Sequence, residues 1–170
     1  IVRTLEIPLA EKIGDNFLEN NGLINELYLP SVINIGSNFL KQNQMLEKLI
    51  IPNVIELKSG TLQHNNNLKE LYAPRVVKIG NNVLELNNSL TEFESLYLEE
   101  VGDNFLKYNR WLEKFIAPNL RKIGLYILSS NNVLIDVDIS SLIDEYKDNL
   151  SKYMKEMLKQ ETPYTLKLKY

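Results

Sequence analysis

Residues 43–68 read NQMLEKLIIPNVIELKSGTLQHNNNL, and they hold one whole copy of a unit that recurs along the chain, N-x-x-L-x-x-L-x-I-P-x-V-x-x-L. The asparagine that opens the unit returns every 22 residues, at Asn21, Asn43, Asn65, Asn87, Asn109 and Asn131. Columns of leucine, proline, isoleucine and glycine keep the same interval. Chance does not align so many columns, so the chain must be interpreted as a repeat array.

A fixed period between about 20 and 29 residues, with leucine at fixed offsets, is typical of a leucine-rich-repeat solenoid, in which each coil buries its apolar face against its neighbours. We therefore predict an α/β horseshoe-like solenoid with short parallel strands on one face and irregular or short helical turns on the other. The solenoid should occupy residues 1–139 in about six to seven coils. Residues 140–170 should form a C-terminal capping helix and a tail.

The strands are predicted at triplets of the L-x-L type, which begin at Leu5, Leu27, Leu49, Leu71, Phe93, Phe115 and Val137. Alternation places the outer two residues of each triplet in the core and the middle one on the exposed face. The proline column ends the strand because proline has no N–H to donate. The glycine column should let the chain turn in an otherwise strained backbone conformation. Segments such as 16–21 suit a short helical turn.

Repeat three and the asparagine column each lead to a separate prediction. Repeat three has Lys58 in the glycine column and Thr61 where other repeats have phenylalanine, which predicts a local distortion. The asparagine column could be a ladder of polar ligands, but we expect buried side chains that bond the backbone of adjacent coils, because buried corners need such partners.

After Ile139 the period of 22 residues ends and a helical pattern begins. Apolar residues fall on one stripe of an amphipathic helix expected over residues 141–159, and they are Leu142, Ile143, Tyr146, Leu150, Tyr153, Met154, Met157 and Leu158. We expect this helix to cover the last coil, and the alternative is a helix that binds a partner.

Composition excludes several classes of function. With 19 basic and 22 acidic side chains the net charge is −3, which is unlike a nucleic-acid binder. There is no cysteine for disulfides or thiolate metal sites, and no apolar run approaches the roughly 20 residues that span a bilayer. Because Ile1 and Val2 already lie within a repeat, we expect a fragment of a longer chain, and a targeting signal would lie in the missing part.

Catalysis needs a nucleophile, a base or a metal cluster in a concave pocket. The chain has one histidine, His64, with no second histidine or cysteine to share a metal, and we expect it in an exposed loop. The glycines follow the repeat and never cluster as a phosphate-binding loop. We therefore predict no enzyme activity, no cofactor and no metal site.

The exposed sheet face carries the predicted binding surface. Its residues, taken in pairs along successive strands, are Thr4/Glu6, Glu26/Tyr28, Lys48/Ile50, Glu70/Tyr72, Glu92/Glu94, Lys114/Ile116 and Asp136/Asp138. Seven acidic and two lysine side chains give this face a net charge of −5. From it we select as candidate binding residues Glu26, Tyr28, Ile50, Glu70, Tyr72, Glu92, Glu94 and Ile116. Apolar anchors inside a polar rim are typical of protein interfaces, but the same residues also suit strand propensity and solubility.

The columns resemble one family in particular, the BspA-like or treponemal-type leucine-rich repeats, with units of the form L-x-x-L-x-L-P-x-x-L-x-x-I-G-x-x-A-F-x-x-C. The resemblance covers residues 1 to about 150 and rests on Leu27, Leu29, Pro30, Ile35, Gly36, Leu46 and their counterparts. Here the A-F pair is Phe39-Leu40, and asparagine always fills the cysteine column. The stretch from Val137 to Lys147 looks like the closing unit that this family often carries.

Membership of that family would imply a secreted or surface-attached microbial protein that binds host or matrix proteins. Our first hypothesis is a non-enzymatic module that docks a protein or a glycan on its open sheet. The alternative is a passive structural spacer within a longer surface or intracellular protein. Truncating Tyr28, Ile50 and Tyr72 should abolish binding in the first case and have no binding to abolish in the second.

Overall fold

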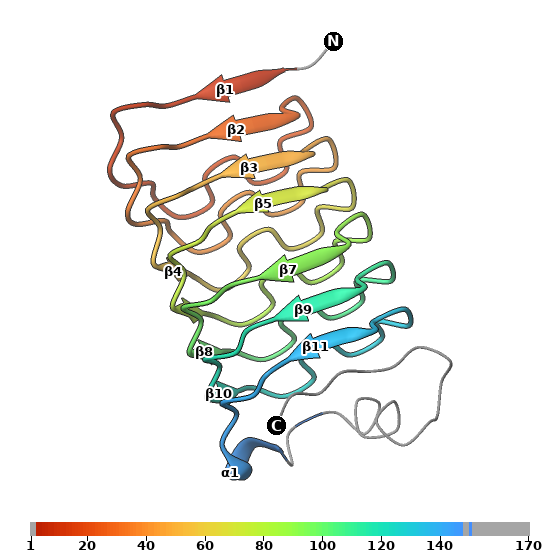
Figure 1. Ribbon diagram of the computed structural model, residues 1–170. Coiled ribbons are helices and arrows are strands. Elements are labelled where there is room, and N and C mark those ends of the chain that lie inside the picture. Colours follow the sequence, from red (N-terminus) through yellow and green to blue (C-terminus); the bar gives the residue numbers. More distant parts are fainter. Residues whose placement is uncertain (1–2, 148–149, 151–170) are drawn as a thin grey trace.

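The computed structural model describes residues 3–147 and residue 150. Within this range the chain is a parallel β-solenoid whose coils stack along one axis, with almost no helix (Figure 1). Each coil crosses the front face once as a three-residue strand and returns along the back through turns. The repeat array that the sequence predicts is therefore the architecture of the molecule.

Among the described residues seven strands form the front face, each beginning and ending one residue before the triplet that predicts it. The first sheet contains β1 (Thr4–Glu6), β2 (Glu26–Tyr28), β3 (Lys48–Ile50) and β5 (Glu70–Tyr72), and the second contains β7 (Glu92–Glu94), β9 (Lys114–Ile116) and β11 (Asp136–Asp138). All pairs within each sheet are parallel, but no pairing joins β5 to β7. The parallel strands that the sequence predicts on this face therefore form two sheets, separated at that step.

The predicted inside and outside of the strands are confirmed. Leu27 and Leu29 are fully buried on either side of the half-buried Tyr28, and Leu49 and Ile51 are fully buried on either side of Ile50. A strand presents alternate residues to opposite faces, so the leucine columns of successive coils meet in one continuous core.

The part of each coil that follows the front strand differs from the prediction. A second parallel sheet runs there, made of β4 (Glu56–Leu57), β6 (Lys78–Ile79), β8 (Glu100–Val101) and β10 (Lys122–Ile123). It lies at one edge of the coils, where Figure 1 shows the short strands one above another. Neighbouring coils therefore bond to each other on two sides of the core.

The expected helical turns are also absent from the described segments. In the first coil Asn16, Leu18 and Asn20 have φ angles of 58°, 54° and 58°, in the left-handed region, and the same alternation recurs in later coils. It directs backbone amides toward the next coil, where Asn16 N donates to Ser37 O at 2.8 Å and Asn20 N donates to Lys41 O at 2.8 Å. These bonds between coils alternate with bonds within the turn, such as Glu19 N to Asn16 O at 3.1 Å, so no continuous helical ladder forms.

The glycine column serves close approach between coils. Its members do not adopt positive φ, and Gly60, outside that column, is the glycine that does. A Cβ on Gly102 would lie 2.2 Å from the Asn81 side-chain oxygen and 2.8 Å from the Gly80 carbonyl carbon. The predicted role of the column in turning the chain is wrong, because the limit comes from the neighbouring coil.

The distortion predicted at repeat three is present on the back of the solenoid. The second sheet begins only at β4, and before it Lys12 and Asn34 form an isolated bridge. Lys58 occupies the glycine column in this coil. The interruption of the ladder therefore falls at the repeat that departs from the pattern.

From Asn43 onward the asparagine column is buried and bonds the backbone of adjacent coils, as predicted, whereas Asn21 in the first coil is half-buried. Asn43, Asn65, Asn87, Asn109 and Asn131 are all fully buried. Each side-chain amide donates to a carbonyl in the preceding coil, for example Asn65 Nδ2 to Leu40 O at 2.8 Å and Asn109 Nδ2 to Leu84 O at 2.8 Å. The column therefore ties the coils together along the corner at which they turn.

At the C-terminal end, a single helical turn is described, α1 (Asp144–Lys147). Leu142 and Leu150 are buried, and Tyr146 packs against the core, while Ile143 is exposed although it lies on the predicted apolar stripe. The rest of the helix expected over residues 141–159, and the tail after it, lie outside the described residues.

Candidate functional site

The front sheet aligns five of the predicted site residues in two rows. Pairing in register sets Glu26 beside Lys48 and Lys48 beside Glu70, and it sets Tyr28 beside Ile50 and Ile50 beside Tyr72. The Tyr72 side chain is 53% exposed, whereas Tyr28 and Ile50 are half-buried. The result is an apolar strip beside a charged row across three strands.

The charged groups of this face are partly neutralised by one another. The Lys48 ammonium lies 2.5 Å from the Glu70 carboxylate, and the Lys114 ammonium lies 3.1 Å from that of Glu94. The Tyr28 hydroxyl donates to the Glu26 carboxylate at 3.1 Å. Acidic groups still outnumber lysines on the strands by seven to two, so the face remains negative.

These contacts alter proton affinity in a consistent direction. Partial burial raises the pKa of Tyr28, and its hydrogen bond to Glu26 raises that pKa further. Hydrogen bonds to Glu70 and Glu94 raise the pKa values of Lys48 and Lys114, respectively. The lysines of the face therefore stay charged and the tyrosine stays neutral through the physiological range.

The break in the front sheet separates the remaining predicted residues from the strip. Glu92 and Glu94 lie on β7 and Ile116 lies on β9, beyond the point where pairing stops. The strands β5 and β7 do not pair, although β6 and β8 remain paired in the same two coils. The coils are thus joined at the back and open at the front.

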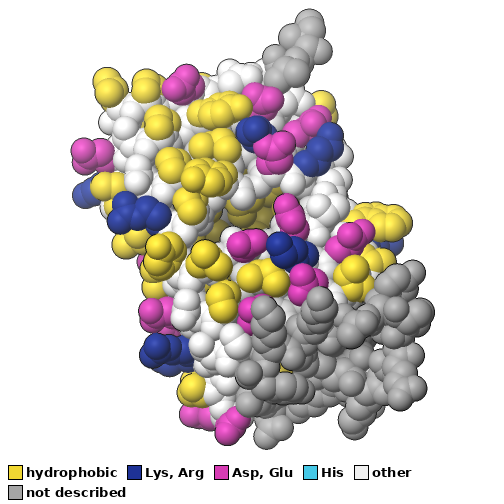
Figure 2. Space-filling view, in the orientation of Figure 1, with side chains coloured by type: hydrophobic (Ala, Val, Ile, Leu, Met, Phe, Trp, Pro, Cys, Tyr) yellow, Lys and Arg dark blue, Asp and Glu magenta, His cyan; other side chains and the backbone are white. Residues whose placement is uncertain are grey.

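A cleft of about 460 Å³ occupies this opening. Its walls come from residues 69–74 of one coil and 92–97 of the next. At its base Leu71 and Ala73 are only half-buried, whereas their counterparts Leu49 and Ile51 one coil earlier are fully buried. Figure 2 shows hydrophobic side chains gathered on the middle of this face, with charged side chains beside them.

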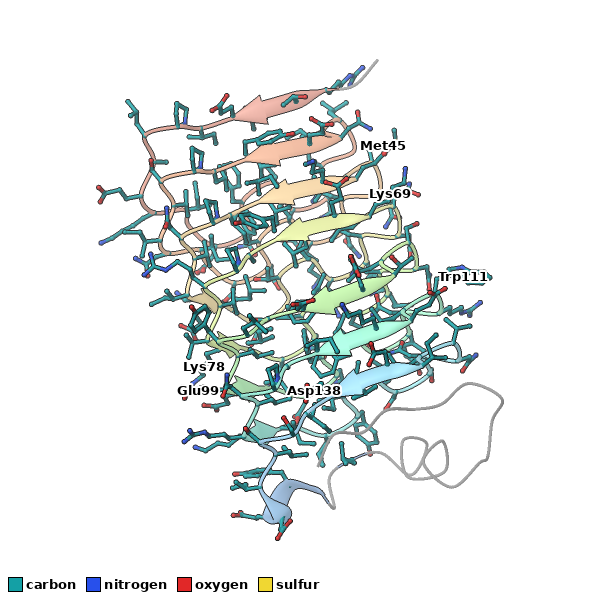
Figure 3. The ribbon with its side chains drawn as sticks, in the orientation of Figure 1. Met45, Lys69, Lys78, Glu99, Trp111 and Asp138 are labelled. Atoms are coloured by element: carbon teal, nitrogen blue, oxygen red, sulfur yellow. The ribbon has the colours of Figure 1, made fainter. Side chains whose placement is uncertain are left out.

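The rim of the cleft is acidic and aromatic. Glu70, Glu92 and Glu94 line it together with Tyr72 and Tyr97, whose side chain is 63% exposed. Lys69 also lines it, at the edge of the sheet where the strands begin (Figure 3), and its ammonium lies 2.8 Å from the Glu47 carboxylate. Within the described chain Glu92 has no ion-pair partner, so its carboxylate is available.

Sequence reasoning selected some of the cleft residues but did not detect the cleft. Ser95 and Leu96 depart from the repeat, which has a larger apolar residue or alanine and then proline at these positions in most coils. Phe93 replaces leucine and stacks with Phe115 at 5.9 Å and meets Phe105 edge-on at 5.3 Å. The break in pairing therefore coincides with a change in core packing, a signal that the sequence contained.

Other chemistry has little support in the described part of the chain. His64 is half-buried rather than exposed, and its carbonyl accepts a hydrogen bond from Gln44 Nε2 at 2.6 Å. The described residues contain no cluster of three or more histidine, cysteine or acidic residues placed to hold a metal ion. Nor does any helix among them have the length and hydrophobicity needed to cross a membrane.

Comparison with known proteins agrees with this architecture. A family model described as the BspA type leucine rich repeat region, present in six copies, matches residues 11–135 and 64–165. A crystal structure of a leucine-rich repeat protein from Bacteroides ovatus has the same fold, with a TM-score of 0.79 and 19% sequence identity. The alignment covers 99% of this chain and 42% of that chain. No curated protein matches the sequence.

Proposed function

This chain belongs to the BspA-type leucine-rich repeat family, and from that premise we propose that it is a non-enzymatic module that docks a partner protein on its open parallel sheet. Repeats of this kind generally mediate protein interactions, and their fold is not typical of enzymes. The proposed contact residues are Glu26, Tyr28, Ile50, Glu70, Tyr72, Glu92, Glu94 and Ile116.

The alignment of Tyr28, Ile50 and Tyr72 is the observation that carries the proposal. The three side chains occupy one row across adjacent strands, and the row beside it contains Glu26 and Glu70. Binding energy in protein interfaces concentrates in aromatic anchors surrounded by a polar rim. An apolar strip bordered by charge on a rigid sheet meets that description.

The net negative charge of the front face defines the chemistry of the partner. Seven acidic groups against two lysines favour a protein with basic residues around an apolar centre, and they disfavour nucleic acid. A glycan is the second class of partner, because exposed tyrosines beside carboxylates also suit sugar rings. We also propose a host or matrix protein as the partner and a secreted or surface-attached location, and resemblance to the family supports both.

The ion pairs between coils favour the alternative of a passive spacer. Lys48–Glu70, Lys69–Glu47 and Lys78–Glu100 each join neighbouring coils, so these charges also serve the solenoid itself. Lys78 lies at the edge opposite Lys69 (Figure 3), and such pairs therefore occur away from the front face. A spacer would need them only for solubility and for alignment of the coils.

A binding screen against purified matrix and host-surface proteins separates the two functions. For any partner found, Tyr28→Ala and Tyr72→Ala should each weaken the affinity by about tenfold or more, mainly through faster dissociation. Glu26→Gln should slow association and reduce its dependence on salt. Arg110→Ala, on an exposed turn outside the front strands, is the control and should have no effect. A partner that responds only to the control would contradict the assignment of the face.

A further inference from the structure

The cleft between β5 and β7 is bounded by two strand edges that face each other without pairing. Glu70 N donates to Glu47 O at 3.0 Å on the side of β3, so the next amide along the strand, that of Leu71, points to the break. Ser95 N donates to Ile116 O at 2.9 Å on the side of β9, so the amides of Glu94 and Glu92 also point to the break. Both walls therefore offer backbone donors and acceptors.

We propose that this cleft binds an extended peptide segment that inserts as an additional strand between β5 and β7. The inference rests on the proposed function, because it uses the same open sheet, but it adds a specific site and mode of binding. Unpaired strand edges bind extended peptides through main-chain hydrogen bonds, and here both sides of one peptide would be bonded. Strands pair at about 4.8 Å, so two unpaired edges must stand roughly twice that distance apart to accept one strand.

The base of the cleft selects small apolar side chains on alternate residues of the peptide. One inward residue would lie between Leu71 and Phe93, and the next between Ala73 and Ser95. Leu71 and Ala73 are the members of their columns left half-buried in the middle of the solenoid. A valine followed two residues later by an alanine would restore the burial that the other coils achieve.

The acidic rim of the cleft selects basic residues at the outward positions of the peptide, which alternate with the inward ones. One outward residue would lie between Glu70 and Glu92, and the next between Tyr72 and Glu94. The Glu92 carboxylate has no ion-pair partner in the described part of the chain, and those of Glu70 and Glu94 each have one lysine. The cleft therefore favours alternating basic and small apolar residues, such as Lys-Val-Lys-Ala.

The two coils are held in a geometry that keeps the cleft open. At the back, β6 pairs with β8, and Leu86 N donates to Lys107 O at 2.9 Å at the turn corner. Phe93 lies on the cleft wall and packs against Phe105 of its own coil and Phe115 of the next coil. The two coils are therefore joined away from the front while β5 and β7 stay unpaired, which leaves both strand edges open to an incoming strand.

The test uses the whole chain and the probe peptide acetyl-GTKVKATG-amide, with binding measured by titration calorimetry at low salt. We expect saturable binding that weakens at least tenfold for the acidic peptide GTEVEATG. The same loss is expected when the valine nitrogen of the probe is methylated, because that peptide keeps its charge but loses a main-chain donor. Equal affinity for the methylated probe would overturn strand insertion.

Hydrogen exchange locates the peptide directly. On binding, the amides of Leu71, Glu92 and Glu94 should exchange at least tenfold more slowly, whereas that of Glu70, already bonded to β3, should not change. Glu92→Gln should weaken probe binding severalfold, and Glu6→Gln, which makes the same change on β1 outside the cleft, should not. Binding without protection of these amides, or no binding at all, would contradict the proposal.

A second variant keeps the two proposals distinguishable. Phe93→Leu restores the leucine of the repeat, and it should let β5 and β7 approach and reduce probe binding at least tenfold while the chain stays folded. A protein partner sensitive to Tyr28→Ala but not to Phe93→Leu would support docking on the strip and contradict strand insertion. Probe binding that is lost in Phe93→Leu, together with no protein partner that responds to Tyr28→Ala, would support strand insertion and contradict docking on the strip.

Discussion

Replacing Asn109 tests whether the buried asparagine column holds the coils together. The Asn109 side-chain amide donates to Leu84 O at 2.8 Å, and its oxygen accepts from Asn87 N at 3.2 Å. Asn109→Ala removes the side-chain partner of both backbone groups at a buried corner. Since an unsatisfied buried group costs about 1–3 kcal/mol, we expect a loss of roughly 2–5 kcal/mol in the free energy of unfolding.

The matched control is Asn119→Ala. Asn119 Nδ2 also donates to a carbonyl of the preceding coil, Leu96 O at 2.7 Å, but this bond is exposed. Water can replace it, so we expect a loss of less than about 1 kcal/mol. Urea unfolding followed by far-UV circular dichroism measures both variants, with the slopes compared to confirm that the same surface unfolds. Equal losses for the two asparagines would refute the argument that burial makes the column structural.

Three further predictions follow from the packing of the coils. Gly102→Ala should destabilise the chain by about 2 kcal/mol or more because the new methyl meets the preceding coil, whereas Gly14→Ala, with nothing within 4 Å, should be nearly neutral in thermal melts. The hydrogen bond to Glu70 raises the pKa of Lys48 from its ordinary 10.5. The stabilisation that this ion pair gives the folded chain should be complete below pH 10.5 and be lost as the pH rises through the raised pKa. A stability–pH curve that is unchanged in Lys48→Met would contradict this prediction. Removing all residues after Ser140 should expose the last coil and cause aggregation or loss of cooperative unfolding. Gel filtration and thermal melts measure both. A truncated chain that stayed monomeric and equally stable would show that the segment is not a cap.

A large part of the fold follows from the sequence because a solenoid converts periodicity directly into contact. Residues 22 positions apart become neighbours, so the column of Leu27 and Leu49 predicts the core and the column of Tyr28 and Ile50 predicts the open face. The asparagine ladder follows in the same way, since a polar column at a buried corner needs backbone partners. Strand alternation then assigns inside and outside without further information.

The tertiary structure decided what depends on the fit between successive coils. A glycine column is compatible with a sharp turn or with close approach, and only the position of Asn81 against Gly102 distinguishes them. The segments at the back have no helical period of their own, and their conformation is set by bonds to the next coil.

The cleft shows the same limit of the sequence for the candidate site. Glu70, Glu92 and Glu94 are visible as acidic residues of the open face, but each repeat taken alone predicts that β5 and β7 pair like their neighbours. The break lies beside the place where Phe93 packs against Phe105 of its own coil and Phe115 of the next coil. Columns of sequence determine which residues face each other, and the sum of side-chain volumes in the core determines how closely the coils approach.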